Sequence, residues 1–271
     1  MISEHGARSL AFTLHPIPEN PRPVDLSALR ADTPSAADHI HLNNAGAALQ
    51  PRAVVDAVVE HLRLEERIGG YEAADAASDA IEGAYDAVAA LLGTRASQIA
   101  MVEHATAGFV AALSSVPFRA GDTILTTRHD YTSNQIQYLA LADRLGVEVL
   151  HAPDRAEGGV DVDAMRDLVH RKGPRLVAMT HVPTNSGLVQ DVAAVGAACR
   201  ERDTLFLVDA CQSVGQMPVD PVALGADFLS ATGRKFMRGP RGSGFLWISE
   251  RALDSGLLPL FRRGSGRVFI I

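Results

Sequence analysis

Residues 205–235, LFLVDACQSVGQMPVDPVALGADFLSATGRK, contain two short apolar runs that each end in polar residues. The first run covers 205–208 and is followed directly by Asp209. The second run ends just before Thr232, Gly233, Arg234 and Lys235. Short apolar runs without polar alternation are typical of strands that are buried on both faces of a parallel sheet. The segment therefore predicts two strands of an α/β sheet, each followed by polar residues.

The same pattern recurs on both sides of this segment. Strands are expected at 99–103, 123–127, 148–151, 175–180, 205–209, 227–231 and 244–248. Helices are expected between them at 108–116, 133–145, 162–171 and 192–202. Further helices are expected earlier, at 26–30, at 51–68 ending at Gly69-Gly70, and at 74–92 ending at Gly93. This alternation predicts an α/β domain with a mainly parallel sheet that is covered by helices on both faces.

Composition and charge predict a soluble, cytoplasmic, globular enzyme. The 271 residues carry 25 Lys+Arg and 32 Asp+Glu, a net charge of −7, and this acidic balance argues against a nucleic-acid partner. No apolar run is long enough to predict a membrane span, and residues 1–14 lack the apolar core of a signal peptide. Cys199 and Cys211 cannot form a disulfide framework, so a reducing compartment is expected.

Motifs of the common nucleotide and metal sites are missing from the sequence. No G-x-G-x-x-G follows the first strand of the α/β region, and no G-x-x-x-x-G-K-[ST] occurs. The glycine-rich stretch at 238–244 precedes a strand rather than opening a helix. The histidines and cysteines show no metal-ligand spacing. A dinucleotide enzyme and a P-loop enzyme are therefore disfavoured, and no metal site is assigned.

Polar residues gather where the expected strands end. In an open α/β sheet, ligands bind at the carboxyl ends of the strands. Five such ends carry polar or ionisable residues, at 103–106, 128–131, 181–185, 209–212 and 232–235. We expect these segments to surround one shared pocket.

Two features of this pocket have both a chemical and a plainer explanation. Asp209, at the rim of an apolar core, needs a cationic or hydrogen-bonding partner. Lys235, against an apolar sheet edge, can lose its proton and act as a Schiff-base amine. The plainer explanation is an ion pair between the two, or two solvated loop residues. Thr106 follows a strand and opens a helix, where it can help to hold a phosphate or simply cap the helix.

A series of motifs runs in order from about Leu42 to Ile248. The main ones are VDACQS at 208–213, DFLSATGRK at 227–235 and GPRGSG at 239–244. Supporting segments are LNNAG at 42–46, GGYEAA at 69–74, DYTSN at 130–134 and TNSG at 184–187. Together they resemble the class V aminotransferase family of pyridoxal 5'-phosphate (PLP) enzymes. That family includes cysteine desulfurases, isopenicillin N epimerase-like proteins and ergothioneine-pathway sulfoxide lyases. The resemblance implies the large domain of the type I PLP-dependent transferase fold.

The resemblance also implies how the cofactor ring is held. Lys235 would form the Schiff base with PLP and then move the α-proton of the substrate. Asp209 would pair with the protonated pyridine nitrogen, which makes the ring an electron sink. Gln212 would contact the ring hydroxyl oxygen, with Asn185 near it, and Tyr131 would stack on the ring.

The phosphate and the substrate have implied partners as well. Thr106, Thr232 and Arg234 would hold the phosphate, and Asn44 with the 45–46 backbone would lie near the substrate carboxylate. Plainer explanations exist for several residues: Tyr131 as a half-buried aromatic at the rim, Asn185 as a turn residue, and Gly69-Gly70 as a helix stop. Cys199 and Cys211 are expected to be small core residues rather than nucleophiles.

The leading hypothesis is a PLP enzyme that acts on an amino acid through a Lys235 Schiff base and α-proton abstraction. C–S lyase or desulfurase-like chemistry is favoured, because 69–74 looks most like that branch, although neither cysteine lies in the loop expected of a classical cysteine desulfurase. The alternatives are an aminotransferase, an epimerase, a PLP-binding but catalytically incompetent fragment, and a plain α/β binding domain.

The expected organisation has three parts. These are an N-terminal arm at 1–40, a PLP-binding large domain at 41–250, and a divergent or truncated tail at 251–271 in place of the family's small C-terminal domain. The resemblance further implies a homodimer with active sites near its interface. The expected partners are thus a small amino acid substrate and a second copy of the chain, with neither nucleic acid nor membrane.

Overall fold

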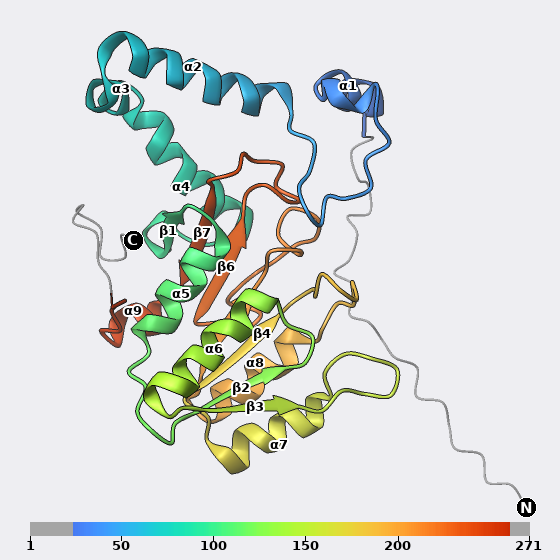
Figure 1. Cartoon of the computed structure of the whole chain (residues 1–271), viewed down its shortest axis with the longest axis vertical. Coiled ribbons are helices and arrows are strands. Elements are labelled where there is room, and N and C mark those ends of the chain that lie inside the picture. The colour runs from blue at the N-terminus through green and yellow to red at the C-terminus, as the bar shows by residue number, and fades with distance from the viewer. Residues whose placement is uncertain (1–23, 261–271) are drawn as a thin grey trace, which may run out of the picture.

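The computed structural model describes residues 24–260, and its centre is a seven-stranded sheet (Figure 1). The strands are β1 (Ile99–Val102), β2 (Thr123–Thr127), β3 (Glu148–Ala152), β4 (Leu176–Thr180), β5 (Leu205–Asp209), β6 (Phe228–Thr232) and β7 (Gly244–Ile248). Their order in the sheet is β1-β7-β6-β5-β4-β2-β3. Strand β7 is antiparallel to β6 and β1, and the other neighbouring pairs are parallel. The predicted α/β fold with a mainly parallel sheet is confirmed.

Helices alternate with most of these strands. They are α1 (Leu26–Ala31), α2 (Arg52–Ile68), α3 (Gly70–Ala76), α4 (Ser78–Leu92), α5 (Ala105–Ser115), α6 (Thr132–Leu145), α7 (Val162–Lys172), α8 (Val192–Glu201) and α9 (Glu250–Asp254). The helix expected at 74–92 has the wrong start. Helix α3 already begins at Gly70, and Ala77 interrupts the helical structure between α3 and α4. Ala77 lies in an alanine-rich stretch that favours helix, and the signal for the break is confined to Ser78 and Asp79 at the start of α4.

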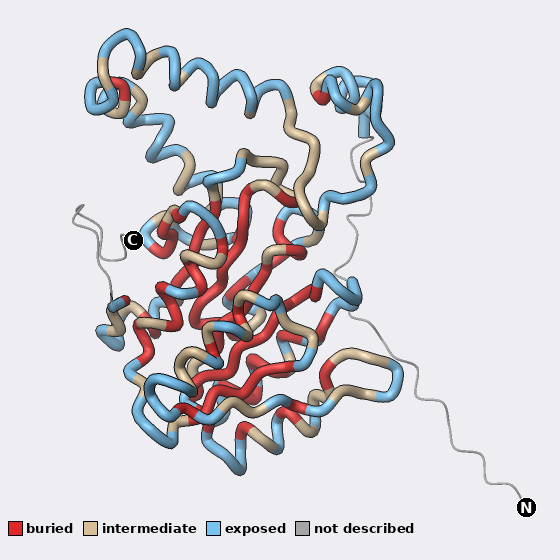
Figure 2. Tube along the Cα trace, viewed as in Figure 1, coloured by how far each residue is buried: buried red, intermediate tan, exposed pale blue. Residues whose placement is uncertain are grey.

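Side chains of the central strands alternate between two apolar clusters, one on each face of the sheet. In β5, Phe206 and Val208 belong to the cluster that includes residues of α4, α7 and α8, whereas Leu207 belongs to the cluster with α5, α6 and α9. Figure 2 shows that the buried residues are concentrated in the strands of the sheet. Both faces of the sheet are therefore covered, which explains why the strands read as continuous apolar runs.

The carboxyl ends of the parallel strands meet at one edge of the sheet. Register pairs Thr180 of β4 with Asp209 of β5, and Asp209 with Ser230 of β6. Because β7 runs antiparallel, its first residue, Gly244, lies at the same edge and pairs with Thr232. A Cβ at Gly244 would lie 2.8 Å from Ala231 O, so glycine is required there. This edge brings polar residues that are far apart in sequence close together.

Parts of the expected organisation lie outside the described residues. These parts are 1–23 of the arm and 261–271 of the tail, so the division into three parts stays a prediction. Within residues 24–260, no helix is both long enough and apolar enough to cross a bilayer.

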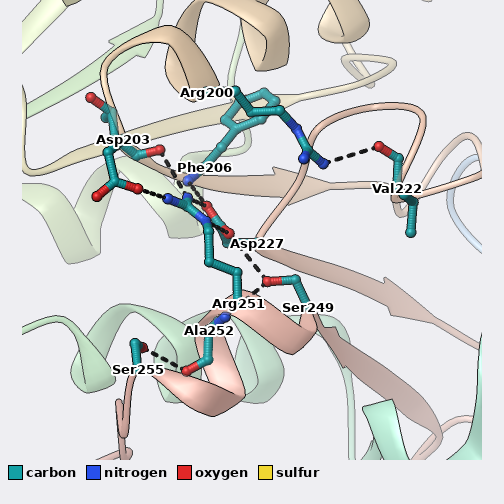
Figure 3. Close-up of polar contacts among 10 residues, drawn as sticks. Arg200, Asp203, Phe206, Val222, Asp227, Ser249, Arg251, Ala252 and Ser255 are labelled. Carbon is teal, nitrogen blue, oxygen red and sulfur yellow. Dashed lines mark hydrogen bonds and ion pairs between the residues drawn. The ribbon is translucent and has the colours of Figure 1, made fainter.

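Arg251 on α9 joins the opposite edge of the sheet through the buried Asp227 (Figure 3). The Asp227 carboxylate accepts hydrogen bonds from Phe206 N at 2.9 Å, from Ser249 Oγ at 3.1 Å and from Arg251 Nε at 2.9 Å. Arg251 also forms an ion pair with the exposed Asp203. A buried carboxylate is costly without such partners, so Arg251 attaches α9 to the sheet and stabilises the charge of Asp227.

We expect the Arg251→Met substitution to lower the free energy of unfolding by about 2 kcal/mol. This is less than the cost of breaking a fully buried pair, because Arg251 is partly exposed to solvent. Urea denaturation measures the change. The control is Arg95→Met, which removes an exposed ion pair with Glu250 and should change the midpoint little. Equal effects of the two substitutions would contradict the assigned role of Asp227.

Candidate functional site

A cavity of about 360 Å³ lies at the carboxyl edge of the sheet. Its walls come from the segments that follow β1, β2, β5 and β6, and from the loop before β7. Of the residues expected from sequence, the lining includes Thr106, Tyr131, Asp209, Thr232, Arg234 and Lys235. The structure therefore brings these residues, which lie as far apart in sequence as Thr106 and Lys235, into one shared pocket.

Gln212, Asn185 and Asn44 are not among the lining residues of this cavity. Gln212 is buried, and its Nε2 donates to Ala45 O at 3.0 Å and to Thr184 Oγ1 at 2.7 Å. It thus joins the segment that contains Asn44 to the segment that contains Asn185. Both asparagines are exposed. The predicted roles of these three residues stay predictions.

Asp209 is held in a fixed orientation at the end of β5. It is 4% exposed, its Oδ1 accepts from Cys211 N at 2.9 Å, and its Oδ2 accepts from Asn134 Nδ2 at 3.0 Å. Among the described residues its partners are neutral N–H donors, so the Asp209–Lys235 ion pair is not formed. The carboxylate therefore lines the cavity as an acceptor that is available to a ligand.

Lys235 lies in the turn that follows β6 and is buried, with 6% of its surface exposed. Its Nζ lies 5.7 Å from the ring centroid of Tyr131, a cation–π distance. Backbone hydrogen bonds hold the turn, from Gly233 N to Ser243 O at 2.9 Å and from Gly239 N to Gly233 O at 2.8 Å. The only other lysine in the sequence is Lys172, which is exposed at the end of α7. Lys235 is thus the one lysine of the cavity.

The first turn of α5 forms another wall of the cavity. Its N-cap is His104, whose Nδ1 accepts from Ala107 N at 3.1 Å, so the plainer explanation of Thr106 as the cap is wrong. Thr106 lies in the first turn, where backbone N–H groups and the helix dipole favour an anion. Arg234 is close by in the lining and donates to Thr232 Oγ1 at 3.3 Å. This side of the cavity is suited to a phosphate.

Both cysteines are poor nucleophiles in this structure. Burial raises the pKa of the Cys199 thiol on α8. Burial and then the charge of Asp209 raise the pKa of the Cys211 thiol, which lines the cavity. Both thiols are therefore protonated near neutral pH. Cys199 is a core residue, as expected, whereas Cys211 is only partly buried and lines the cavity.

Sequence reasoning gave no role to several lining residues, among them Glu103, His104, Asn134 and Arg241. Asn134 is the most informative of these, because its side chain contacts both Asp209 and Asp130. Asp130 lies in the loop just before α6, four residues ahead of Asn134 in the first turn of that helix, and such a polar residue ahead of a helix start often accepts from the first turn. The sequence signal that could have identified Asn134 was therefore its spacing from Asp130 within the DYTSN segment at 130–134.

Comparisons with known proteins find a family and several relatives that this chain resembles. The family model of class-V aminotransferases matches residues 40–268. The chain is 32% identical over 224 residues to a probable cysteine desulfurase of Methanothermobacter thermautotrophicus, covering 82% of this chain and 56% of that protein. It is 31% identical over 225 residues to a probable hercynylcysteine sulfoxide lyase of Mycobacterium tuberculosis, covering 83% and 55%. The chain thus spans a little over half the length of these relatives.

Solved structures share the fold as well. The apo structure of a cysteine desulfurase from Thermococcus onnurineus has a TM-score of 0.80 at 28% identity, covering 89% of this chain and 60% of that chain. A mutant of C-DES with glycine covalently linked to its PLP cofactor also has a TM-score of 0.80, at 25% identity, covering 87% and 62%.

His181 is a buried titratable residue that lies beside the site. It follows β4, its backbone N donates to Asp209 O at 2.9 Å, and it is 5% exposed. Its Nδ1 has no hydrogen-bond partner within residues 24–260. Burial lowers the pKa of His181 to about 4, so the ring is neutral at pH 7.

We expect His181 to make the fold sensitive to acid. Its pKa is about 4 in the folded state and near 6.5 when unfolded, so its contribution to stability is lost as the pH falls from 6.5 to 4. The loss is roughly 2 to 3 kcal/mol. Urea denaturation at pH 7.5 and pH 4.5 should show a smaller loss for His181→Gln than for the wild type. Identical losses would contradict this role.

Proposed function

The chain belongs to the aminotransferase class-V family, and from this premise we propose that it binds PLP and cleaves a C–S bond of an amino acid. The observation that carries the proposal is the cavity itself, which combines a buried lysine, a fixed carboxylate and an anion site. The relatives named cysteine desulfurase and hercynylcysteine sulfoxide lyase support the choice of C–S chemistry.

The donors and acceptors of the cavity fit the functional groups of PLP. Lys235 Nζ is a buried amine, which suits an aldehyde carbon. Asp209 has acceptor capacity left beside its two N–H donors, which suits a protonated ring nitrogen. The first turn of α5, with Thr106 and Arg234, suits a phosphate. When bound, PLP supplies an electron-withdrawing ring that stabilises negative charge at the α-carbon of an amino acid.

The side chains of this chain have distinct tasks in that reaction. Lys235 Nζ holds the cofactor and then takes and returns the α-proton of the substrate. Asp209 keeps a negative charge beside the ring nitrogen. Tyr131, which is 41% exposed, forms the rim of the cavity close to Lys235. Burial of Lys235 and Asp209 keeps bulk water from both groups, which strengthens their electrostatic interactions with a ligand.

The cysteines bear on the type of C–S chemistry. A transfer of sulfur to a cysteine needs a reactive thiolate. Burial raises the pKa of both Cys199 and Cys211, and this chain contains 2 cysteines. Elimination of the sulfur group is therefore favoured over sulfur transfer to a cysteine of this chain.

Lys235→Ala is expected to abolish covalent attachment of PLP. Incubation of the wild type with PLP followed by borohydride reduction should label Lys235, as read by peptide mass spectrometry, and the visible absorption band should disappear in the variant. Lys172→Ala is the matched control and should keep both signals, because Lys172 is exposed on α7.

Release of sulfide tests the reaction itself in unreduced samples of the same proteins, either from L-cysteine directly or from L-cystine after dithiothreitol has reduced the cysteine persulfide that cleavage of cystine forms. The wild type and Lys172→Ala should release sulfide, and Lys235→Ala should not. Labelling of Lys235 without any sulfide release would refute C–S cleavage by this chain and leave cofactor binding. Turnover by Lys235→Ala would contradict the whole assignment.

We further propose that the protein is a homodimer and that it works in the cytoplasm. The apolar face of α2 supports the dimer: none of its 17 residues is buried, and Val55, Val58, Val59 and Leu62 are 42%, 42%, 37% and 59% exposed. The helix stands away from the sheet in Figure 1. An exposed apolar stripe of this kind is typical of an interface. The free cysteines agree with a reducing compartment.

The double substitution Val58→Glu with Leu62→Glu is expected to convert the dimer into a monomer, because it places charges within the apolar face of α2. Size-exclusion chromatography with light scattering measures the mass, and circular dichroism checks the fold. Glu60→Lys, on the other face of the helix, is the control and should stay dimeric. A monomeric wild type, or a double variant that stays dimeric, would contradict the proposed interface.

A further inference from the structure

Asp130, in the loop between β2 and α6, is the centre of a hydrogen-bond network beside the cavity. Its Oδ1 accepts from Tyr131 N at 2.6 Å, Asn134 Nδ2 at 2.9 Å and Thr180 Oγ1 at 2.6 Å. Its Oδ2 accepts from Thr126 Oγ1 at 3.2 Å, Gln135 Nε2 at 3.4 Å and Tyr138 Oη at 3.0 Å. These donors come from β2, β4 and α6, so the carboxylate of Asp130 is fixed from three sides.

Asn134 connects this network to the site. Its Nδ2 donates one hydrogen bond to Asp130 Oδ1 at 2.9 Å and another to Asp209 Oδ2 at 3.0 Å. Asn134 is 2% exposed and lines the cavity. Ionised carboxylates only accept hydrogen bonds, so the amide nitrogen, and not the amide oxygen, must face both of them. The orientation of Asn134 is therefore determined by its two partners.

The two linked carboxylates also concentrate negative charge beside the cavity. Burial raises the pKa of Asp130, and the charge of Asp209 raises it further, while hydrogen bonds from Thr180 and Asn134 oppose the shift. Negative charge held in this way favours a cationic group at the free acceptor sites of Asp209. Among the described residues Lys235 forms no ion pair with Asp209, so an acceptor site of that carboxylate is available to a cationic ligand atom.

We propose that Asp130 and Asn134 are positioning residues, which hold the Asp209 carboxylate toward the protonated ring nitrogen of the bound heteroaromatic cofactor. The inference rests on the proposed function and adds to it. Hydrogen bonds from β2, β4 and α6 hold Asp130 in place, and Asp130 in turn holds the side chain of Asn134. Asn134 then holds Oδ2 of Asp209. Neither residue needs to touch the cofactor for this effect.

The test compares binding of two ligands to the cofactor-free protein by equilibrium dialysis. One ligand is PLP, and the other is its analogue in which carbon replaces the ring nitrogen. Asn134→Ala should weaken PLP binding about tenfold, equivalent to about 1.4 kcal/mol, because Asp209 is no longer held in place. Binding of the carbon analogue should not change, since that ligand has no ring nitrogen for Asp209 to meet.

Ile136→Ala is the matched control. Ile136 also lies on α6, is 55% exposed, and has an apolar side chain that cannot join the hydrogen bonds of Asp130. This substitution should leave the affinity for both ligands unchanged. If Asn134→Ala does not fold, Asn134→Ser, which keeps one donor, should show the same ligand dependence with a smaller loss.

Two results would overturn the inference while the proposed function stands. One is an equal loss of affinity for both ligands in Asn134→Ala, which indicates a general structural role. The other is no loss for either ligand. If the wild type itself binds neither ligand, the proposed function fails, and the inference fails with it.

Discussion

The hydrogen bonds that hold the Asp209 carboxylate are the interaction on which the site depends. Asp209 ends a strand whose other residues are apolar and buried, and a carboxylate in that position is costly unless donors surround it. Cys211 N and Asn134 Nδ2 meet this need while leaving acceptor sites open toward the cavity. The protein therefore carries a fixed carboxylate at the sheet edge that can accept from a ligand atom, and none of residues 24–260 forms an ion pair with it.

Sheet topology brings the other reacting groups to the same place. Strands β5 and β6 are neighbours. Asp209 at the end of β5 and Lys235 in the turn after β6 therefore lie at the same edge of the sheet. The antiparallel β7 begins at that edge and returns the chain away from it. At the opposite edge, Arg251 and Asp227 attach α9 (Figure 3). The cavity thus lies at one end of the strands, and the contact that attaches α9 lies at the other end. This separation is usual where a rigid sheet supports functional loops.

Most of the fold could be predicted because buried strands and amphipathic helices follow local patterns. The limits of β2, β5 and β7 were predicted correctly, since each is an apolar run bounded by polar or turn residues. The direction of β7 could not be predicted, because apolar runs contain no information on strand direction. The break at Ala77 was missed because alanine dominates the stretch around it, although Ser78 and Asp79, which follow the break, are residue types common at helix starts.

For the site, the position of Asp209 and Lys235 after apolar runs pointed to the cavity, and family resemblance supplied their roles. The link from Asp130 through Asn134 to Asp209 depends on contacts between residues 75 positions apart, which no local pattern records. Similarly, His104 replaces Thr106 as the cap of α5 because of its side-chain geometry, and histidine is not among the residue types that signal a cap.

We propose that Lys235 and Asp209 hold PLP from two sides of the cavity. A crystal structure of the protein grown with PLP would show this arrangement. We expect continuous electron density from Lys235 Nζ to the cofactor, with the ring nitrogen at Asp209 and the phosphate at the first turn of α5. Density for the cofactor elsewhere, or an empty cavity at saturating PLP, would contradict this proposal.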